Sequence, residues 1–244
     1  MNKRNFSKHI MWLFLLLFLV LVGMIFWVCR TIYRTQGRVM LEFDIHQNPD
    51  AILFSAFGEP PQFAIWLEDS QTGHLQTVFV TYRSATGDWV GKVECPDALP
   101  RWFEVYKQEM NTTTLPRLNA SSAIIAVTGA TPQAEHFKIR AEVPPGSDWI
   151  CWIEVNLAGD FNAAYRQYDE DLQTVDIHFS GQPALVYRGK IHAVTGEEVE
   201  PELYGQSSVE NPVVRPVSTG VTTAKDIFQS IHIRAIKPNP KLFE

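Results

Sequence analysis

The chain has 244 residues, of which 45% are hydrophobic and 20% are charged, a composition typical of a folded protein that can bury a core. Its formal net charge is -6, and its lysine and arginine residues are scattered rather than clustered. Because phosphate groups are held by clustered cationic side chains, this charge pattern excludes nucleic acid as an expected partner.

The N-terminal end carries the strongest signal in the sequence. A basic tail is followed by Ile10–Cys29, twenty residues without a charge. A helix of this length rises about 30 Å, which matches the hydrocarbon thickness of a bilayer. Bulky residues follow the apolar run where a cleavage site would need small ones, so the segment is predicted to stay attached. The sequence therefore predicts a cytoplasmic tail (1–9), a transmembrane signal anchor in the lipid bilayer (10–29), a stalk (30–37) and an exported domain (38–244).

The positive charges on the two sides of this segment are almost balanced. They are Lys3, Arg4 and Lys8 before it and Arg30, Arg34 and Arg38 after it. The positive-inside rule therefore decides little, and the short tail is interpreted as the cytoplasmic side.

The three cysteines leave two interpretations open. Cys29 lies in the apolar run, so Cys95 and Cys151 form either a disulfide in an oxidising compartment or two buried free thiols. Cys151 shares strand parity with the apolar Trp149 and Ile153, which favours the buried thiols.

Beyond the stalk, apolar and polar residues alternate, as they do in strands with one buried face. Strands are predicted at Arg38–His46, Gln62–Glu68, Leu75–Arg83, Phe137–Val143, Trp149–Leu157, Leu172–Ser180, Ala184–Ala193 and Ile227–Ile236. So many short strands, bounded by turn residues, predict an all-β fold, an antiparallel β-sandwich of the immunoglobulin or fibronectin type.

One short helix is predicted at Asp97–Met110, where aromatic and apolar residues recur at helical spacing and Asp97 can serve as the N-cap. The segments Gly159–Asp171 and Thr195–Asp226 are predicted to be long irregular loops. Loops of this length within a compact domain are often functional, so the sequence places a candidate site there.

No sequence signature of a known catalytic site is found, so no enzymatic activity and no catalytic residues are predicted. Four histidines, His46, His178, His192 and His232, lie on the polar parity of predicted strands, where they could bind a transition metal or be ordinary surface residues. The acidic residues near Asp160 could bind Ca²⁺ or form a solvated loop. The surface and loop interpretations are favoured, and no metal is predicted. Most tryptophans are expected in the core.

Several stretches resemble the DUF2271 family of predicted periplasmic proteins. The matching stretches are FAIWLED (63–69), LPRWF (99–103), AVTGATP (126–132), PPGSDWICWIEVN (144–156), GDFNAAY (159–165), GQPALVYRGKI (181–191), EPEL (200–203) and TTAKDI (222–227). They keep a consistent order from Val39 to Lys237 and so cover nearly the whole predicted exported domain.

The resemblance implies an exported β-sandwich, placed by a single pass in the inner (cytoplasmic) membrane with its C-terminal domain in the periplasm. It also implies an association with membrane redox modules of the PepSY type and with flavin transferases. Flavin-carrying proteins have a motif Asp-x-x-Ser/Thr-Gly-Ala-Thr, whose last threonine is linked to FMN. Thr128, Gly129, Ala130 and Thr131 match this motif, but Ile125 stands at its acidic position. The same residues suit a turn at the end of a strand, and that interpretation is favoured.

The sequence thus predicts a membrane-anchored periplasmic accessory or binding module, without its own enzymatic activity, that works with a membrane protein partner. The alternative is an electron carrier with FMN attached at Thr131.

Overall fold

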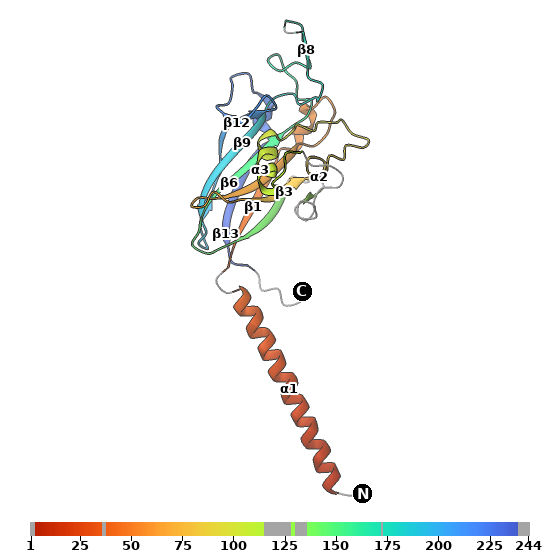
Figure 1. Cartoon of the computed structure of the whole chain (residues 1–244), viewed down its shortest axis with the longest axis vertical. Coiled ribbons are helices and arrows are strands. Elements are labelled where there is room, and N and C mark those ends of the chain that lie inside the picture. Colours follow the sequence, from red (N-terminus) through yellow and green to blue (C-terminus); the bar gives the residue numbers. More distant parts are fainter. Residues whose placement is uncertain (1–2, 36–37, 115–127, 130–135, 172, 239–244) are drawn as a thin grey trace.

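A long N-terminal helix precedes two β-sheets that face each other (Figure 1). The computed structural model describes residues 3–35, 38–114, 128–129, 136–171 and 173–238. Beyond position 38 the two sheets contain most of the regular secondary structure of the described residues, and helices contribute little. The fold is therefore an antiparallel β-sandwich, as the alternating sequence pattern predicts.

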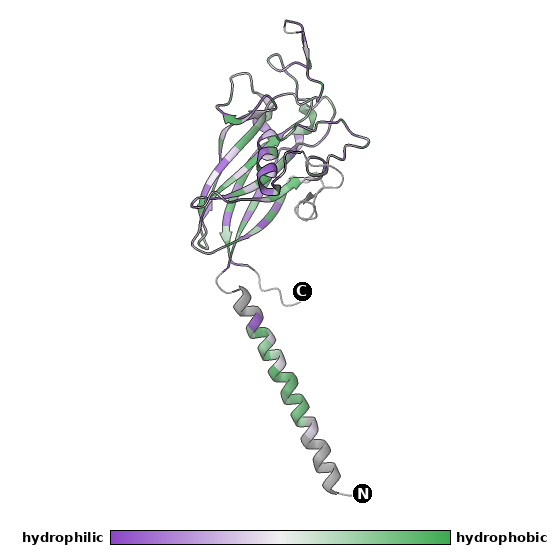
Figure 2. Cartoon of the chain, viewed as in Figure 1, coloured by the Kyte–Doolittle hydropathy of each residue, from purple (hydrophilic) through white to green (hydrophobic). Residues whose placement is uncertain are grey.

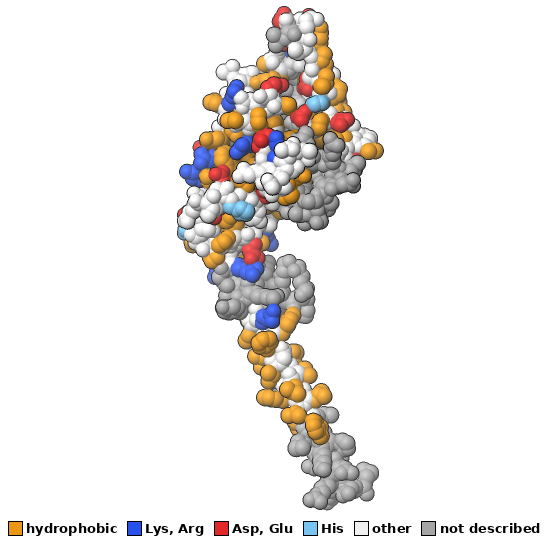
Figure 3. All heavy atoms as spheres, viewed as in Figure 1, with side chains coloured by type: hydrophobic (Ala, Val, Ile, Leu, Met, Phe, Trp, Pro, Cys, Tyr) orange, Lys and Arg blue, Asp and Glu red, His pale blue; other side chains and the backbone are white. Residues whose placement is uncertain are grey.

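The helix α1 (Lys3–Thr35) contains the long apolar run of the sequence. From Phe14 to Val28 each residue is exposed, and hydrophobic side chains cover this part of the helix (Figures 2 and 3). Among the described residues, no helix has a segment that is both long and apolar enough to span a membrane. The anchor at residues 10–29 thus stays a prediction.

The smaller sheet has four antiparallel strands in the order β10 (Glu198–Val199), β13 (Phe228–Ile236), β1 (Val39–Gln47) and β5 (His136–Val143). The larger sheet has seven strands in the order β12 (Asn211–Arg215), β11 (Glu202–Ser208), β9 (Ala184–His192), β6 (Asp148–Asn156), β2 (Gln62–Asp69), β3 (Leu75–Thr81) and β4 (Thr128–Gly129). All its neighbours are antiparallel except β3 and β4. A separate hairpin of β7 (Tyr168–Asp169) and β8 (Thr174–Val175) projects from the top of the domain (Figure 1).

The main hydrophobic core lies between the two sheets. Phe43 and Ile45 of β1 are fully buried in one cluster with Ile65 of β2 and Ile153 of β6. These residues occupy alternate positions of their strands, so the alternation in the sequence corresponds to one inward-facing side. Cys151 lies in this core and is free.

A second core lies on the opposite face of the seven-stranded sheet, where the helix α3 (Pro100–Met110) covers it. Trp102 of α3 is fully buried there together with Trp66 of β2, and its Nε1 donates to Thr77 Oγ1 over 3.2 Å. Cys95 belongs to this core and is also free, so the two thiols are separate and the interpretation as buried free cysteines is confirmed.

The short elements connect these layers. They are the 3-10 helices η1 (Pro49–Phe54) and η2 (Thr223–Asp226) and the helix α2 (Tyr82–Thr86), which directly follows β3 where the sequence predicts a longer strand. Beyond the helix α1, Trp66, Trp89, Trp102 and Trp149 are buried, as expected, and Trp152 is partly exposed.

The strand predicted at Leu172–Ser180 is wrong beyond the two residues of β8. Asp176 Oδ1 accepts from the backbone N–H of His178, and its Oδ2 accepts from that of Gly181. Phe179 also has a φ of 54°. A side chain that bonds the next backbone groups closes a turn and competes with strand pairing, which explains the error.

The irregular loop predicted at Thr195–Asp226 is also wrong, because it contains β10, β11, β12 and η2. A register shift between Leu203 and Gly205 breaks the alternation of β11 and hides this strand in the sequence. A Cβ at Gly205 would lie 2.4 Å from the carbonyl oxygen of Arg215, so only glycine permits this close strand contact.

Candidate functional site

The residues of the flavin motif fall largely outside the described part of the chain. Thr128 and Gly129 form β4, the edge strand that runs parallel to Val80 and Thr81 of β3. Ala130, Thr131 and Ile125 lie outside the described residues, so FMN attachment at Thr131 stays a prediction.

The four histidines singled out in the sequence do not converge. His46 of β1 stacks on His136 of β5 with ring centroids 4.1 Å apart, and His232 lies on β13 of the same sheet. His192 pairs with Asp148 at 2.8 Å on the other sheet, whereas His178 lies in the loop before β9. Within the described residues, no group of three or more potential ligands is placed to hold a metal ion.

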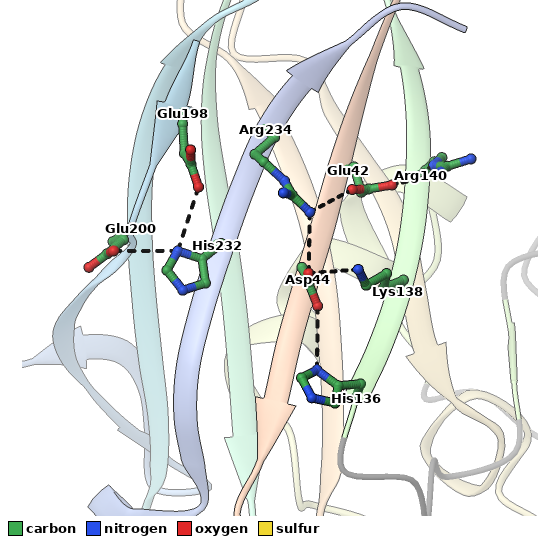
Figure 4. A network of polar contacts seen from close by, with 9 residues as sticks. All are labelled: Glu42, Asp44, His136, Lys138, Arg140, Glu198, Glu200, His232 and Arg234. Atoms are coloured by element: carbon green, nitrogen blue, oxygen red, sulfur yellow. Dashed lines mark hydrogen bonds and ion pairs between the residues drawn. The ribbon is translucent and has the colours of Figure 1, made fainter. Parts of the chain in front are cut away.

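The outer face of the four-stranded sheet carries a network of ion pairs (Figure 4). Glu42 of β1 is bridged by Arg140 at 2.6 Å and Arg234 at 2.9 Å, and Asp44 is bridged by Lys138 at 2.9 Å. Partial burial works to raise the pKa of Asp44, but the cations around it hold that pKa below its ordinary value. Because these carboxylates and cations satisfy one another on neighbouring strands, the network is best explained as support for the sheet.

A cavity of about 550 Å³ opens at the end of the seven-stranded sheet where β6 ends and β9 begins. Its walls come from the start of the α3 segment, the loop between β6 and β9, and the turn between β11 and β12. The volume lies within the range of small-molecule sites. The polar lining residues are Asp97, Asn156, Tyr165, Arg166, Asp169, Thr174, Asp176, His178, Ser180, Gln182, Ser207, Ser208 and Glu210.

Asn156 lines this cavity and is only 3% exposed. Its Nδ2 donates to the carbonyl oxygens of Ser180 at 3.1 Å and Gln182 at 2.9 Å. Its Oδ1 has no hydrogen-bond partner among the described residues. A buried acceptor without a donor is unfavourable by about 1–3 kcal/mol, so a donor that reached this atom in the wall would be stabilised.

Asp97 and His178 meet at the cavity wall. The Nδ1 of His178 forms a close ion pair with Oδ2 of Asp97, and both residues line the cavity. The prediction that Asp97 caps the helix is wrong, because α3 begins at Pro100 and the N-cap Leu99 makes no side-chain cap bond.

Glu154 takes the capping role that Asp97 does not. Its Oε1 accepts from the N–H of Arg101 at 2.9 Å and from Ser207 Oγ, and its Oε2 accepts from the N–H of Trp102 at 2.6 Å. Burial raises the pKa of this carboxyl to about 7, although the three donors work against that rise. Ser207 also lines the cavity, so this buried group lies directly behind the cavity wall.

Asp160 joins two segments around the cavity. The loop interpretation of the acidic segment treats Asp160 as solvated, but it is 1% exposed and accepts from the Gln182 N–H at 2.8 Å. Burial raises its pKa to about 7, and the bond from Gln182 opposes the rise. The same Gln182 accepts from the N–H of Thr222 at 2.6 Å, so it ties the cavity wall to the segment before β13.

Sequence reasoning finds only part of this site. The long loop Gly159–Asp171 is correctly placed beside the cavity, through Ala164, Tyr165, Arg166 and Asp169. The segment Thr195–Asp226 also lines the cavity, through Ser207, Ser208, Val209 and Glu210. Sequence reasoning misses Asn156 and Asp97 as lining residues, because they come from two other segments. The isolated polar residues Glu154 and Asn156 at the end of the apolar strand β6 were the available signal.

No protein-family model, no curated protein and no solved structure matches the chain. The resemblance to the DUF2271 family therefore stays a prediction, and the cavity itself has to carry the functional argument.

Proposed function

We propose that the chain is a membrane-anchored exported binding module whose cavity beside Asn156 binds a small polar ligand. The observation that carries this proposal is the unsatisfied Oδ1 of a buried asparagine in a cavity of ligand size. Strands β6, β9 and β11 supply part of the lining of this cavity. Strands hold side chains more firmly than loops do.

Four further statements belong to this proposal. The domain lies in the periplasm, it acts without catalysis, its partner is a membrane redox module of the PepSY type, and its sandwich is of the immunoglobulin or fibronectin type. The first and third rest on the resemblance stated above, and the last is supported by the two facing antiparallel sheets. An electron-carrying role through FMN at Thr131 is not proposed, because the described residues supply no argument for it.

Filling the cavity tests the binding function. A library of small polar compounds is screened by thermal unfolding of the full-length protein, since a ligand at a hundred times its Kd stabilises the folded state by about 2.7 kcal/mol. We expect compounds that raise the unfolding midpoint of the wild type but not of Ser208→Trp, whose indole occupies the cavity. Ser230→Trp on β13, away from the cavity, is the matched control and should respond as the wild type does. The proposal would be overturned if Ser208→Trp still responded to the compounds as the wild type does. It would also be overturned if no compound in the library raised the unfolding midpoint of the wild type.

The anchor has its own test. It is supported by the twenty uncharged residues Ile10–Cys29 and by the exposed apolar side chains from Phe14 to Val28. We expect Leu16→Arg combined with Leu19→Arg to release the protein from membranes during an alkaline wash, since each arginine near the centre of a span opposes insertion by about 3 kcal/mol. The pair Leu16→Ile and Leu19→Ile should stay in the membrane fraction. A wild-type chain that is washed off, or a domain protected from protease added to spheroplasts, would contradict the anchored, exported placement.

A further inference from the structure

The orientation of the Asn156 amide is determined by its neighbours. The carbonyl oxygens of Ser180 and Gln182 can only accept, so the atom that faces them must be the amide nitrogen. Oδ1 is therefore the atom left without a partner, and it is an acceptor. Whatever contacts it has to donate an N–H or O–H.

The charges around the cavity select among such donors. Four carboxylates line it, from Asp97, Asp169, Asp176 and Glu210, against two basic side chains, Arg166 and His178. His178 pairs with Asp97, which leaves three lining carboxylates against one arginine, Arg166, whose Nε donates to the carbonyl oxygen of Ala163 at 3.2 Å. The cavity therefore has an excess of negative charge, which favours a cation over an anion of the same size.

Further carboxylates lie just behind the lining. Glu154 contacts the cavity through Ser207, and Asp160 contacts it through Gln182. Both are buried, so any charge they carry acts through the protein interior. Such a charge is screened less than it would be in water.

We infer that the ligand of this cavity carries a protonated amine, whose N–H donates to Asn156 Oδ1 while its charge is balanced by the carboxylates of the wall. This inference rests on the proposed binding function and adds the chemical class of the ligand. An ammonium group has three donors and no acceptor, so it matches an acceptor-rich cavity at both the charge and the hydrogen-bond level.

Two sets of matched probes test the ligand class on the full-length protein. One set is glucosamine, glucose and glucuronate, and the other is ethanolamine, ethylene glycol and glycolate, so size is constant within a set while charge changes from positive to neutral to negative. Affinity is measured by calorimetry at a pH at which both amines are protonated. We expect the amine to bind at least about tenfold more tightly than the neutral member, the range of a charged hydrogen bond, and the carboxylate to bind most weakly.

Variants locate the effect. Glu210 is exposed at the turn between β11 and β12, so Glu210→Gln should leave folding unchanged and weaken amine binding about threefold with no change for the neutral probe. Glu170→Gln on the adjacent hairpin, outside the lining, is the control and should change neither. Asn156→Leu should weaken amine binding by at least about tenfold, with its folding checked by circular dichroism.

The outcomes separate this inference from the proposed function. Equal binding of amine and neutral probes, tighter binding of the carboxylate, an unchanged amine affinity in Glu210→Gln, or no binding by any probe of either set would overturn the amine class. The cavity proposal would then stand or fall on the library screen with Ser208→Trp. The amine preference together with its loss in Glu210→Gln would support both.

Discussion

Replacing Trp102 by alanine is expected to lower the free energy of unfolding by about 3–5 kcal/mol, the usual range for a large buried aromatic side chain. Trp102 is fully buried between α3 and the seven-stranded sheet, and it packs beside Phe103 and Tyr106. Its removal would leave a cavity in the second core and would remove the indole bond to Thr77 Oγ1, which keeps its bond to Glu109. Because α3 also supplies part of the cavity wall, the variant should lose ligand binding as well.

Chemical denaturation of the full-length protein measures this loss. Leu53→Ala is the matched control, since Leu53 is 76% exposed and its truncation should change the free energy by less than about 0.5 kcal/mol. A Trp102→Ala protein as stable as the control would show that α3 does not hold the sheet face as described.

Changing Glu154 is expected to alter both stability and its pH dependence. Alanine at this position leaves the N–H groups of Arg101 and Trp102 and the Ser207 hydroxyl buried without their acceptor, which should cost about 3 kcal/mol or more. Glutamine keeps one acceptor oxygen and should be less destabilising.

The pH dependence follows from the raised pKa. The carboxyl has an ordinary pKa of 4.5, and burial raises it to about 7 in the folded protein. Between these values the folded state binds more protons than the unfolded state, so stability falls as pH rises from about 4.5 to about 7. Asp160, whose pKa burial also raises to about 7, contributes in the same direction.

Denaturation curves across this pH range measure the effect. Glu154→Gln should reduce the slope, and the remaining slope should be that of Asp160 and the other titrating groups. Each unit of pKa difference corresponds to about 1.4 kcal/mol, so the change is well above the error of the method. An identical slope in the wild type and in Glu154→Gln would mean that the buried carboxyl does not titrate as described.

The sandwich could be predicted from the sequence because its central strands obey strict alternation. In β1 the apolar residues Phe43 and Ile45 point into the core, and in β6 Ile153 does the same. The strand β11 could not be predicted, since its register shift and its glycine break that alternation. The turn at residues 176–181 failed for a different reason, because the bonds of the Asp176 side chain override the apolar character of its neighbours.

The cavity could be predicted only in part. A long loop before β9 indicates where a site can form, but it does not reveal which strands line the cavity. Asn156, Ser207 and Asp97 meet only after the sheet order brings β6, β11 and the α3 segment together. The charge excess arises in the same way, from carboxylates that are far apart in the chain.

The side chain of Gln182 gives the cavity a mechanical role in the sandwich. Its Nε2 donates to Asp160 and its Oε1 accepts from Thr222, so one amide joins the loop after β6 to the segment that leads into β13. Those two segments belong to opposite layers. A compound bound against this wall would thus restrict the movement of one layer relative to the other.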